Sequence, residues 1–207
     1  MRTTDTMSFS LKKIVAEGKA QSVGREEWLH AVAEIYDEDK LRSVVATSSL
    51  LEHLGTVAVP KTKQFVARNH FAVNTKATAP TKISYLGDNF KAWFLGETEE
   101  PSDETTLRYQ NLREASVDGP IIAELGGEAK AETTLAQIYA LMKGQKNGET
   151  GVPLNNGYAN IFYVCDVGSV LRAVSVGWVG VGWGVSARSV ENPGGWGGGG
   201  RVFSRDS

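Results

Sequence analysis

The 207-residue sequence has little of what would point to a specific chemistry. Its single cysteine, Cys165, excludes an internal disulfide and a zinc site built from several cysteines. A formal net charge of −2 provides no global positive field for a nucleic-acid partner. No apolar run reaches the roughly 18 to 20 residues of a membrane helix, and the N-terminus lacks the apolar stretch of a signal peptide. We therefore expect no membrane insertion and, by default, a cytoplasmic protein.

Groups for catalysis or metal binding are equally scarce. The three histidines, His30, His53 and His70, show no metal-ligand spacing, and Cys165 lies in an apolar run typical of a buried position. The run of glycines from 197 to 200 has neither the lysine of a phosphate-binding loop nor a strand-to-helix context. We therefore predict a protein that is not an enzyme and has no catalytic residue, metal or cofactor.

Charge is distributed unevenly along the chain. The sequence has 22 basic and 24 acidic residues, yet only seven of them lie in residues 151–207. The N-terminal part shows helical periodicity, and Ser49 with Glu52 matches a capping box that would begin a short helix ending at Gly55. We therefore predict a helical accessory segment over residues 1–56 and a second domain over residues 57–207.

The middle of the chain alternates between β-like stretches and short helices. Residues 57–84 are β-like, Asp88 is expected to cap a brief helix that ends at Gly96, and the acidic stretch over 97–110 is expected to be a surface loop. A capping box of Thr134 and Gln137 predicts a helix that ends at Gly144.

The C-terminal part is predicted to be a sheet. Strands are expected at 159–166, 170–178, about 181–190 and 201–204, with a change of phase near Val179 and Gly180. Side chains on one face are mostly large and apolar, and we assign them to the core: Val174, Val176, Trp178, Val181, Trp183, Val185 and Ala187. The other face is nearly bare: Ser175, Gly177, Val179, Gly182, Gly184, Ser186 and Arg188.

Glycine weakens a strand by roughly 0.5–1 kcal/mol per residue, so three glycines on one face need a reason. A close backbone neighbour, sheet curvature and a series of bulges are structural reasons. An interchangeable binding surface is a functional one. The residues alone leave these alternatives open.

The C-terminal sequence resembles the variable region of diversity-generating retroelement variable proteins of archaeal, candidate-phylum or viral type. The resemblance extends from about Thr81 to Ser207. Its signature segments are LRAV at 171–174, GW at 182–183, SVENP at 189–193, Trp196 and VFSR at 202–205. It implies an α+β protein with a C-type lectin fold, in which a strand and two helices precede a curled antiparallel sheet.

In that family, adenine-directed mutagenesis replaces asparagine codons and thereby varies the residues that bind ligand, over about 174–207 here. Gly182 fits by codon, but its place before Trp183 is also compatible with a fixed scaffold position. The resemblance implies ligand-binding variable positions at Gly177, Val179, Gly180, Gly184, Ser186, Arg188, Gly194, Gly195, Gly197, Gly198 and Gly200.

The resemblance thus predicts a non-enzymatic protein that displays a hypervariable surface, with a protein as its ligand. Because most of these positions hold glycine, we expect this variant to bind weakly, with Arg188 as its one anchor. A carbohydrate-binding module of fixed specificity, an enzyme of the formylglycine-generating type and a structural virion protein are the alternatives. The Glu-Pro-Asn order of calcium-dependent lectins is not matched by Glu191-Asn192-Pro193, which argues against calcium-dependent sugar binding.

Overall fold

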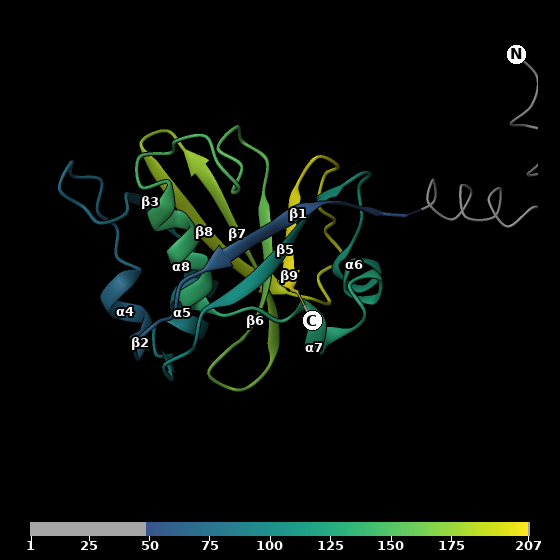
Figure 1. Cartoon of the computed structure of the whole chain (residues 1–207), viewed down its shortest axis with the longest axis horizontal. Helices are drawn as coiled ribbons and strands as arrows, with labels where there is room; N and C mark the ends of the chain where they lie inside the picture. Colours follow the sequence, from purple (N-terminus) through teal and green to yellow (C-terminus); the bar gives the residue numbers. More distant parts are fainter. Residues whose placement is uncertain (1–48, 207) are drawn as a thin grey trace, which may run out of the picture. The chain divides into compact units, whose positions relative to one another are not determined.

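The computed structural model describes residues 49–206, and residues 50–207 form one compact unit. The described chain is α+β, with a mixed seven-stranded sheet, a two-stranded sheet and short helices (Figure 1). The order in the large sheet is β1-β5-β9-β6-β7-β8-β3. The elements are β1 (Leu51–Val59), β2 (Phe65–Val66), α4 (Ala67–His70), β3 (Ile83–Leu86), α5 (Asp88–Phe94), β4 (Thr98–Glu99), β5 (Thr105–Leu112), α6 (Asp118–Glu124), α7 (Glu128–Ala131), α8 (Leu135–Gly144), β6 (Asn160–Cys165), β7 (Leu171–Val179), β8 (Gly182–Ser189) and β9 (Arg201–Arg205).

Helices cover the two faces of the large sheet unequally. Helices α4, α5 and α8 pack on one face, against a core that includes Val174, Val176 and Val185. Helices α6 and α7 pack on the other, in a smaller core with Ile161 and Ala173. Figure 1 shows the two groups of helices on opposite sides of the strands. Because strand side chains alternate between faces, each central strand contributes to both cores.

The helix predicted from Thr134 is confirmed. The Thr134 hydroxyl accepts from the Gln137 backbone N–H, and the Gln137 side chain accepts from the Thr134 N–H in return. Glu99 adds two further acceptors, for the N–H groups of Leu135 and Ala136. The first turn of α8 is therefore well satisfied. Burial raises the pKa of Glu99, and these backbone hydrogen bonds oppose the rise.

The predicted short helix from Ser49 is wrong. Residues from Leu51 onward form β1, which pairs antiparallel with β5 and has a bulge between His53 and Gly55. Gly55 lies in this bulge, where an added Cβ would come within 2.9 Å of the Tyr109 hydroxyl. The sheet therefore begins six residues before the predicted domain start at residue 57. The rest of the predicted helical segment lies outside the described residues.

The acidic stretch at 97–110 is only partly a loop, because Thr98 and Glu99 form β4 and its second half forms the interior strand β5. Leu107 and Leu112 of β5 are fully buried, and β5 pairs with both β1 and β9. The helix expected near Asp88 exists as α5, but its N-cap is Gly87. Asp88 is the first helical residue and forms an ion pair with Lys91.

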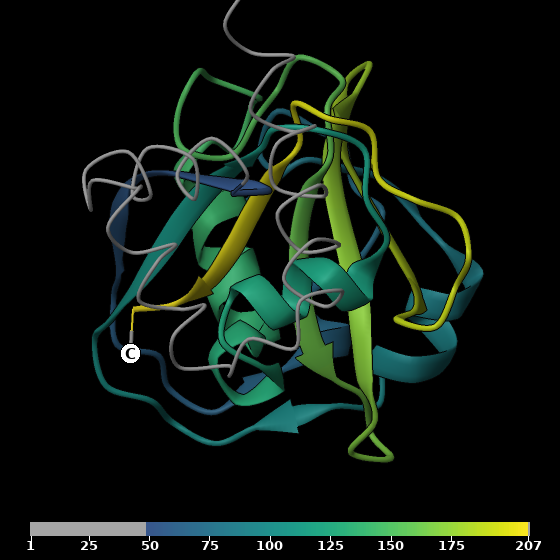
Figure 2. The same ribbon diagram turned by 90° about the vertical axis from the view of Figure 1, so that its right-hand side faces the viewer.

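The C-terminal strands lie close to their predicted positions, and two details differ. The turn between β7 and β8 consists of Gly180 and Val181, so Val181 is 64% exposed and does not belong to the core. The sheet is also not wholly antiparallel, because β3 runs parallel to β8 and β6 runs parallel to β9. Between β8 and β9 the chain makes a long excursion, seen in yellow in Figure 2.

Candidate functional site

One part of the large sheet is covered by none of the helices within residues 49–206. On β7, Leu171 and Ala173 are buried beneath α6 and α7. From Ser175 onward, helices α6 and α7 no longer cover this face. Ser175 and Gly177 are half-buried there, and Val179 is exposed. Among the described residues, this end of the face is open and accessible to a ligand.

A groove of about 340 Å³ lies over this open end. Gly177 of β7 is directly opposite Gly184 of β8, and together they leave its floor without side chains. Tyr85 of β3 and Tyr158 of the loop before β6 line it and are 54% and 50% exposed. Val179 and Ser186 complete the predicted positions in the groove. The structure thus brings Gly177, Val179, Gly184 and Ser186 together.

Side chains would fit at several of the predicted glycines. A Cβ on Gly177 would come no closer than 3.9 Å to another residue, and one on Gly197 would have nothing within 4 Å. A Cβ on Gly184 would lie 3.3 Å from a terminal methyl of Val179, which can rotate. At Gly194 the nearest atom is the side-chain oxygen of Asn192, at 3.0 Å. None of these positions requires glycine for the backbone to approach another strand.

Other predicted glycines are held against neighbouring backbone. A Cβ on Gly195 would lie 3.1 Å from the Ser116 carbonyl oxygen, and one on Gly198 would lie 3.0 Å from that of Arg113. Gly200 is buried, with the Ala159 carbonyl oxygen 3.2 Å from its Cβ position. The approaches of Gly195 and Gly198 arise because the 195–200 segment runs beside residues 112–116, joined by backbone hydrogen bonds.

Two further glycines of the hairpin are constrained. Gly180 adopts a φ of +64° in the turn between β7 and β8, a conformation that favours glycine in two-residue hairpins. Gly182 is buried, and a Cβ there would lie 2.8 Å from the backbone nitrogen of Ser84. This close approach is the reason for a glycine at 182 and supports its interpretation as scaffold.

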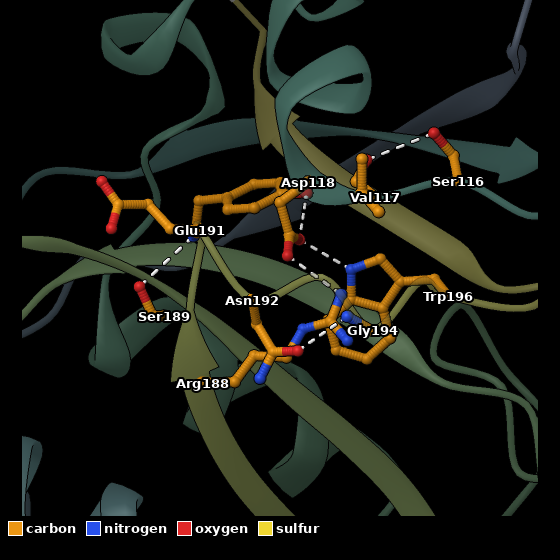
Figure 3. A network of polar contacts seen from close by, with 10 residues as sticks. Ser116, Val117, Asp118, Arg188, Ser189, Glu191, Asn192, Gly194 and Trp196 are labelled. Carbon is orange, nitrogen blue, oxygen red and sulfur yellow. Dashed lines mark hydrogen bonds and ion pairs between the residues drawn. The ribbon is translucent and has the colours of Figure 1, made fainter.

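Arg188 lies on the same face as the groove but at its covered end. Its Nη2 donates to Asp118 Oδ2 at 2.9 Å, and its guanidinium carbon stacks 3.6 Å from the centroid of the Trp196 ring (Figure 3). The Arg188 side chain is 18% exposed and that of Asp118 is fully buried. The structure therefore does not bring Arg188 into the groove, and its charge is engaged inside the protein.

Asp118, at the start of α6, is the centre of this network. Its Oδ1 accepts from Tyr163 Oη at 2.9 Å and from Trp196 Nε1 at 2.6 Å. Burial and then the adjacent Asp118 carboxylate raise the pKa of Tyr163, so its hydroxyl remains protonated and donates. Donors from β6, β8 and the 190–200 segment thus meet one carboxylate, which fixes that segment to α6.

Sequence reasoning missed Tyr85, Tyr158 and Asp118. Tyr85 reaches the groove because β3 pairs with β8, which places it opposite Gly184. Tyr158 lies beside Gly199, whose Cβ position is 2.9 Å from the tyrosine ring. Asp118 had a local signal, since it precedes Gly119 and Pro120 in a pattern typical of a helix start. Its three partners are between 45 and 78 residues away in the chain, and no local signal reveals them.

Comparisons with known proteins add no relative. A scan against protein-family models, a search of curated proteins and a search of solved structures each found no match. No helix of residues 49–206 is both long and apolar enough to span a membrane. Within the same residues no group of three or more histidine, cysteine or acidic side chains is placed to hold a metal ion.

Proposed function

We propose that the chain is a non-enzymatic ligand-binding protein whose open sheet face displays interchangeable side chains. The observation that carries the proposal is the division of β7 and β8 into two faces. On one face Val174, Val176, Trp183 and Val185 are at most 1% exposed and hold the core together. On the open part of the other face, Gly177 and Gly184 form the floor of the groove, and each has room for a side chain. Substitution on that face would leave the core intact.

We further propose that the fold is of the C-type lectin kind and that the face is diversified by a retroelement. The order of β3, α5, α8 and the strands β6 to β9 agrees with the order that the sequence resemblance implies. The mixed sheet and the additional strands β1 and β5 go beyond that simple scheme. The retroelement origin rests on the sequence resemblance and on the codons it implies.

The structure favours a display set smaller than the resemblance implies. We assign display to the positions that accept a side chain, which are Gly177, Val179, Gly184, Ser186, Gly194 and Gly197. Backbone contacts or conformation make the remaining positions scaffold, namely Gly180, Gly195, Gly198 and Gly200. We also assign Arg188 to the scaffold, because its removal would leave the buried Asp118 carboxylate without its counter-charge.

The groove suits a protein ligand. No charged side chain of residues 49–206 lines it, and Tyr85 and Tyr158 provide amphipathic rings of the kind that dominate binding energy at protein interfaces. Both tyrosines lie outside the variable region, so they would be present in every variant. We infer that they supply a constant part of the affinity, while the residues between them set specificity.

The two exposed tyrosines also favour a second candidate, a carbohydrate-binding module of fixed specificity. Aromatic rings and the hydroxyls of Ser175 and Ser186 could receive a neutral sugar in the same groove. A glycan array tests this candidate, and calcium should make no difference to it. Binding that survives Gly177→Ser and Gly184→Ser but fails in Tyr85→Ala would favour the fixed module over variable display.

The neighbouring DNA tests the retroelement origin. We expect a near-identical non-coding copy of the last part of the gene, beside a reverse-transcriptase gene, with adenines at the codons of Gly177, Gly184 and Gly197. Sequences from related isolates should differ at these codons and agree at those of Gly198 and Trp183. Identical codons at all five positions across many isolates would contradict the proposal.

A further inference from the structure

A second cavity, of about 610 Å³, lies on the side of the sheet that α4, α5 and α8 cover. It is bounded by the segment from Pro60 to Phe65, the end of α4 and one side of α8 along its whole length. Helices α4 and α8 lie near each other in Figure 1. It shares no lining residue with the groove between the tyrosines. Its volume is in the range of pockets that hold small organic ligands, roughly 300–1,000 Å³.

The charge around this cavity has one sign. Lys61, Lys63 and Lys143 line it together with His70, and no carboxylate of the described part of the chain does. None of the three lysines forms an ion pair with a residue of the described chain. The adjoining hollow of about 460 Å³ shares Lys61 and Lys63 and adds one carboxylate, that of Asp103. Positive charge thus remains in excess in a protein whose formal net charge is −2.

Flat aromatic groups form the inner wall. The His70 ring stacks on Phe65 with centroids 4.2 Å apart and planes 8° apart, and the Tyr139 ring is 4.8 Å from His70. Phe65 is 5% exposed and Tyr139 is 7% exposed, so packing holds these rings in place. A fixed apolar wall beneath flexible lysines is suited to a ligand with a flat apolar part and an anionic end.

The environment of His70 agrees with this arrangement. Burial and then the positive charge of Lys143 lower the pKa of His70. The other groups around the His70 ring are Phe65, Tyr139 and the two remaining lysines of the cavity. The imidazole is therefore neutral at pH 7 and can donate or accept a hydrogen bond. A bound anion would offset the charge of Lys143 and raise the pKa of His70 again.

We propose that this cavity is a binding site for a phosphate monoester of a flat apolar group, with the phosphate among Lys61, Lys63 and Lys143 and the flat group against the His70–Phe65–Tyr139 wall. Three lysines favour a dianion over a monocarboxylate because a dianion neutralises more of their mutual repulsion. The volume of about 610 Å³ matches a small molecule.

Titration calorimetry on the full chain tests the proposal, with phenyl phosphate, inorganic phosphate, benzoate and phenol as probes. We expect phenyl phosphate to bind best and phenol to bind at least about tenfold more weakly. Lys61→Gln and Lys63→Gln should each weaken phenyl phosphate binding by roughly three- to tenfold. Lys76→Gln is the matched control, because Lys76 is exposed and does not line the cavity. The Lys76→Gln substitution should leave phenyl phosphate binding unchanged.

Proton NMR of the histidines supplies a second readout. Phenyl phosphate should move the His70 imidazole signals and raise the pKa of His70, while the signals of His53 stay unchanged. Absence of phenyl phosphate binding up to about 10 mM would overturn the proposal, since a site with three cations should reach that affinity. Equal losses in Lys61→Gln and Lys76→Gln would also overturn it. So would tighter binding of a single-stranded oligonucleotide through the same lysines, which would indicate a polymer ligand.

Discussion

Gly177 and Gly184 lie directly opposite each other in the β7–β8 pair, at the floor of a groove between two exposed tyrosines. The neighbouring pairs, Val176 with Val185 and Trp178 with Trp183, point to the other face and belong to the main core. Around these two glycines, the apolar packing of the hairpin therefore lies on the face away from the groove. Residues 177 and 184 are consequently free to change without loss of packing.

The first prediction concerns these two glycines. Gly177→Ser and Gly184→Ser should leave the free energy of unfolding unchanged or raise it by up to about 1 kcal/mol each, because a strand gains when glycine is replaced. Urea denaturation measures the change. Gly182→Ser in the same strand is the control, because its Cβ would lie 2.8 Å from Ser84 N, and it should cost roughly 1–3 kcal/mol. Equal losses at all three positions would contradict this division.

The second prediction compares two adjacent glycines of the 190–200 segment. Gly198→Ala should lower the free energy of unfolding by roughly 1–3 kcal/mol, because the new methyl group would press on the backbone of Arg113 and Glu114. Gly197→Ala should be nearly neutral, since its Cβ would meet nothing within 4 Å. Thermal or urea unfolding of the two variants decides the matter. Similar stability of both would show that this segment does not need its close approach to residues 112–116.

The third prediction concerns the buried carboxylate. Asp118→Ala should cost roughly 3–5 kcal/mol of unfolding free energy, because it leaves Arg188 without its counter-charge and two donors without their acceptor. A double-mutant cycle with Arg188→Ala should show strong coupling. Asp88→Ala removes a carboxylate from an exposed ion pair and should change stability little. Additive effects of the Asp118 and Arg188 substitutions would mean that the ion pair does not fix the segment.

The fourth prediction is a pH dependence. Burial alone would raise the pKa of Asp166, but hydrogen bonds from Arg172 and from the backbone N–H groups of Val170 and Gly168 outweigh it and lower the pKa. A lowered pKa in the folded state stabilises the protein at pH values above the ordinary pKa of 3.8. This stabilisation is lost as the pH falls through the lowered pKa.

Asp166→Asn should therefore cost roughly 1–3 kcal/mol at pH 7. The difference from the parent should shrink as the solution is made more acidic. Urea denaturation of both proteins over a series of pH values measures it. A constant difference at every pH would show that the charge of Asp166 contributes nothing.

The sequence predicted the elements whose signals are local. The capping box of Thr134 and Gln137 identified α8, and alternation along β7 and β8 separated the core face from the bare face. Val181 was wrongly assigned to the core, because it lies in the two-residue turn and belongs to neither strand. The alternation of apolar residues does not reveal where a turn lies.

Features that depend on distant residues could not be predicted. Strand β1 contains mostly exposed residues and resembles a capped helix, and only its pairing with β5 makes it a strand. Tyr85 and Gly184 are neighbours through the parallel pairing of β3 and β8, which sequence periodicity does not reveal. The distinction between Gly197 and Gly198 likewise follows from residues 112–116, which lie far away in the chain.

The most direct test of the display surface is selection from a library in which Gly177, Val179, Gly184 and Ser186 are randomised. Clones are first screened for protease resistance, so that only folded variants are compared. We expect most clones to fold and binders to a chosen protein target to emerge. Tyr85→Ala and Tyr158→Ala should weaken those binders by about tenfold or more without unfolding them. A library that folds but yields no binder, or binders indifferent to both tyrosines, would contradict the account.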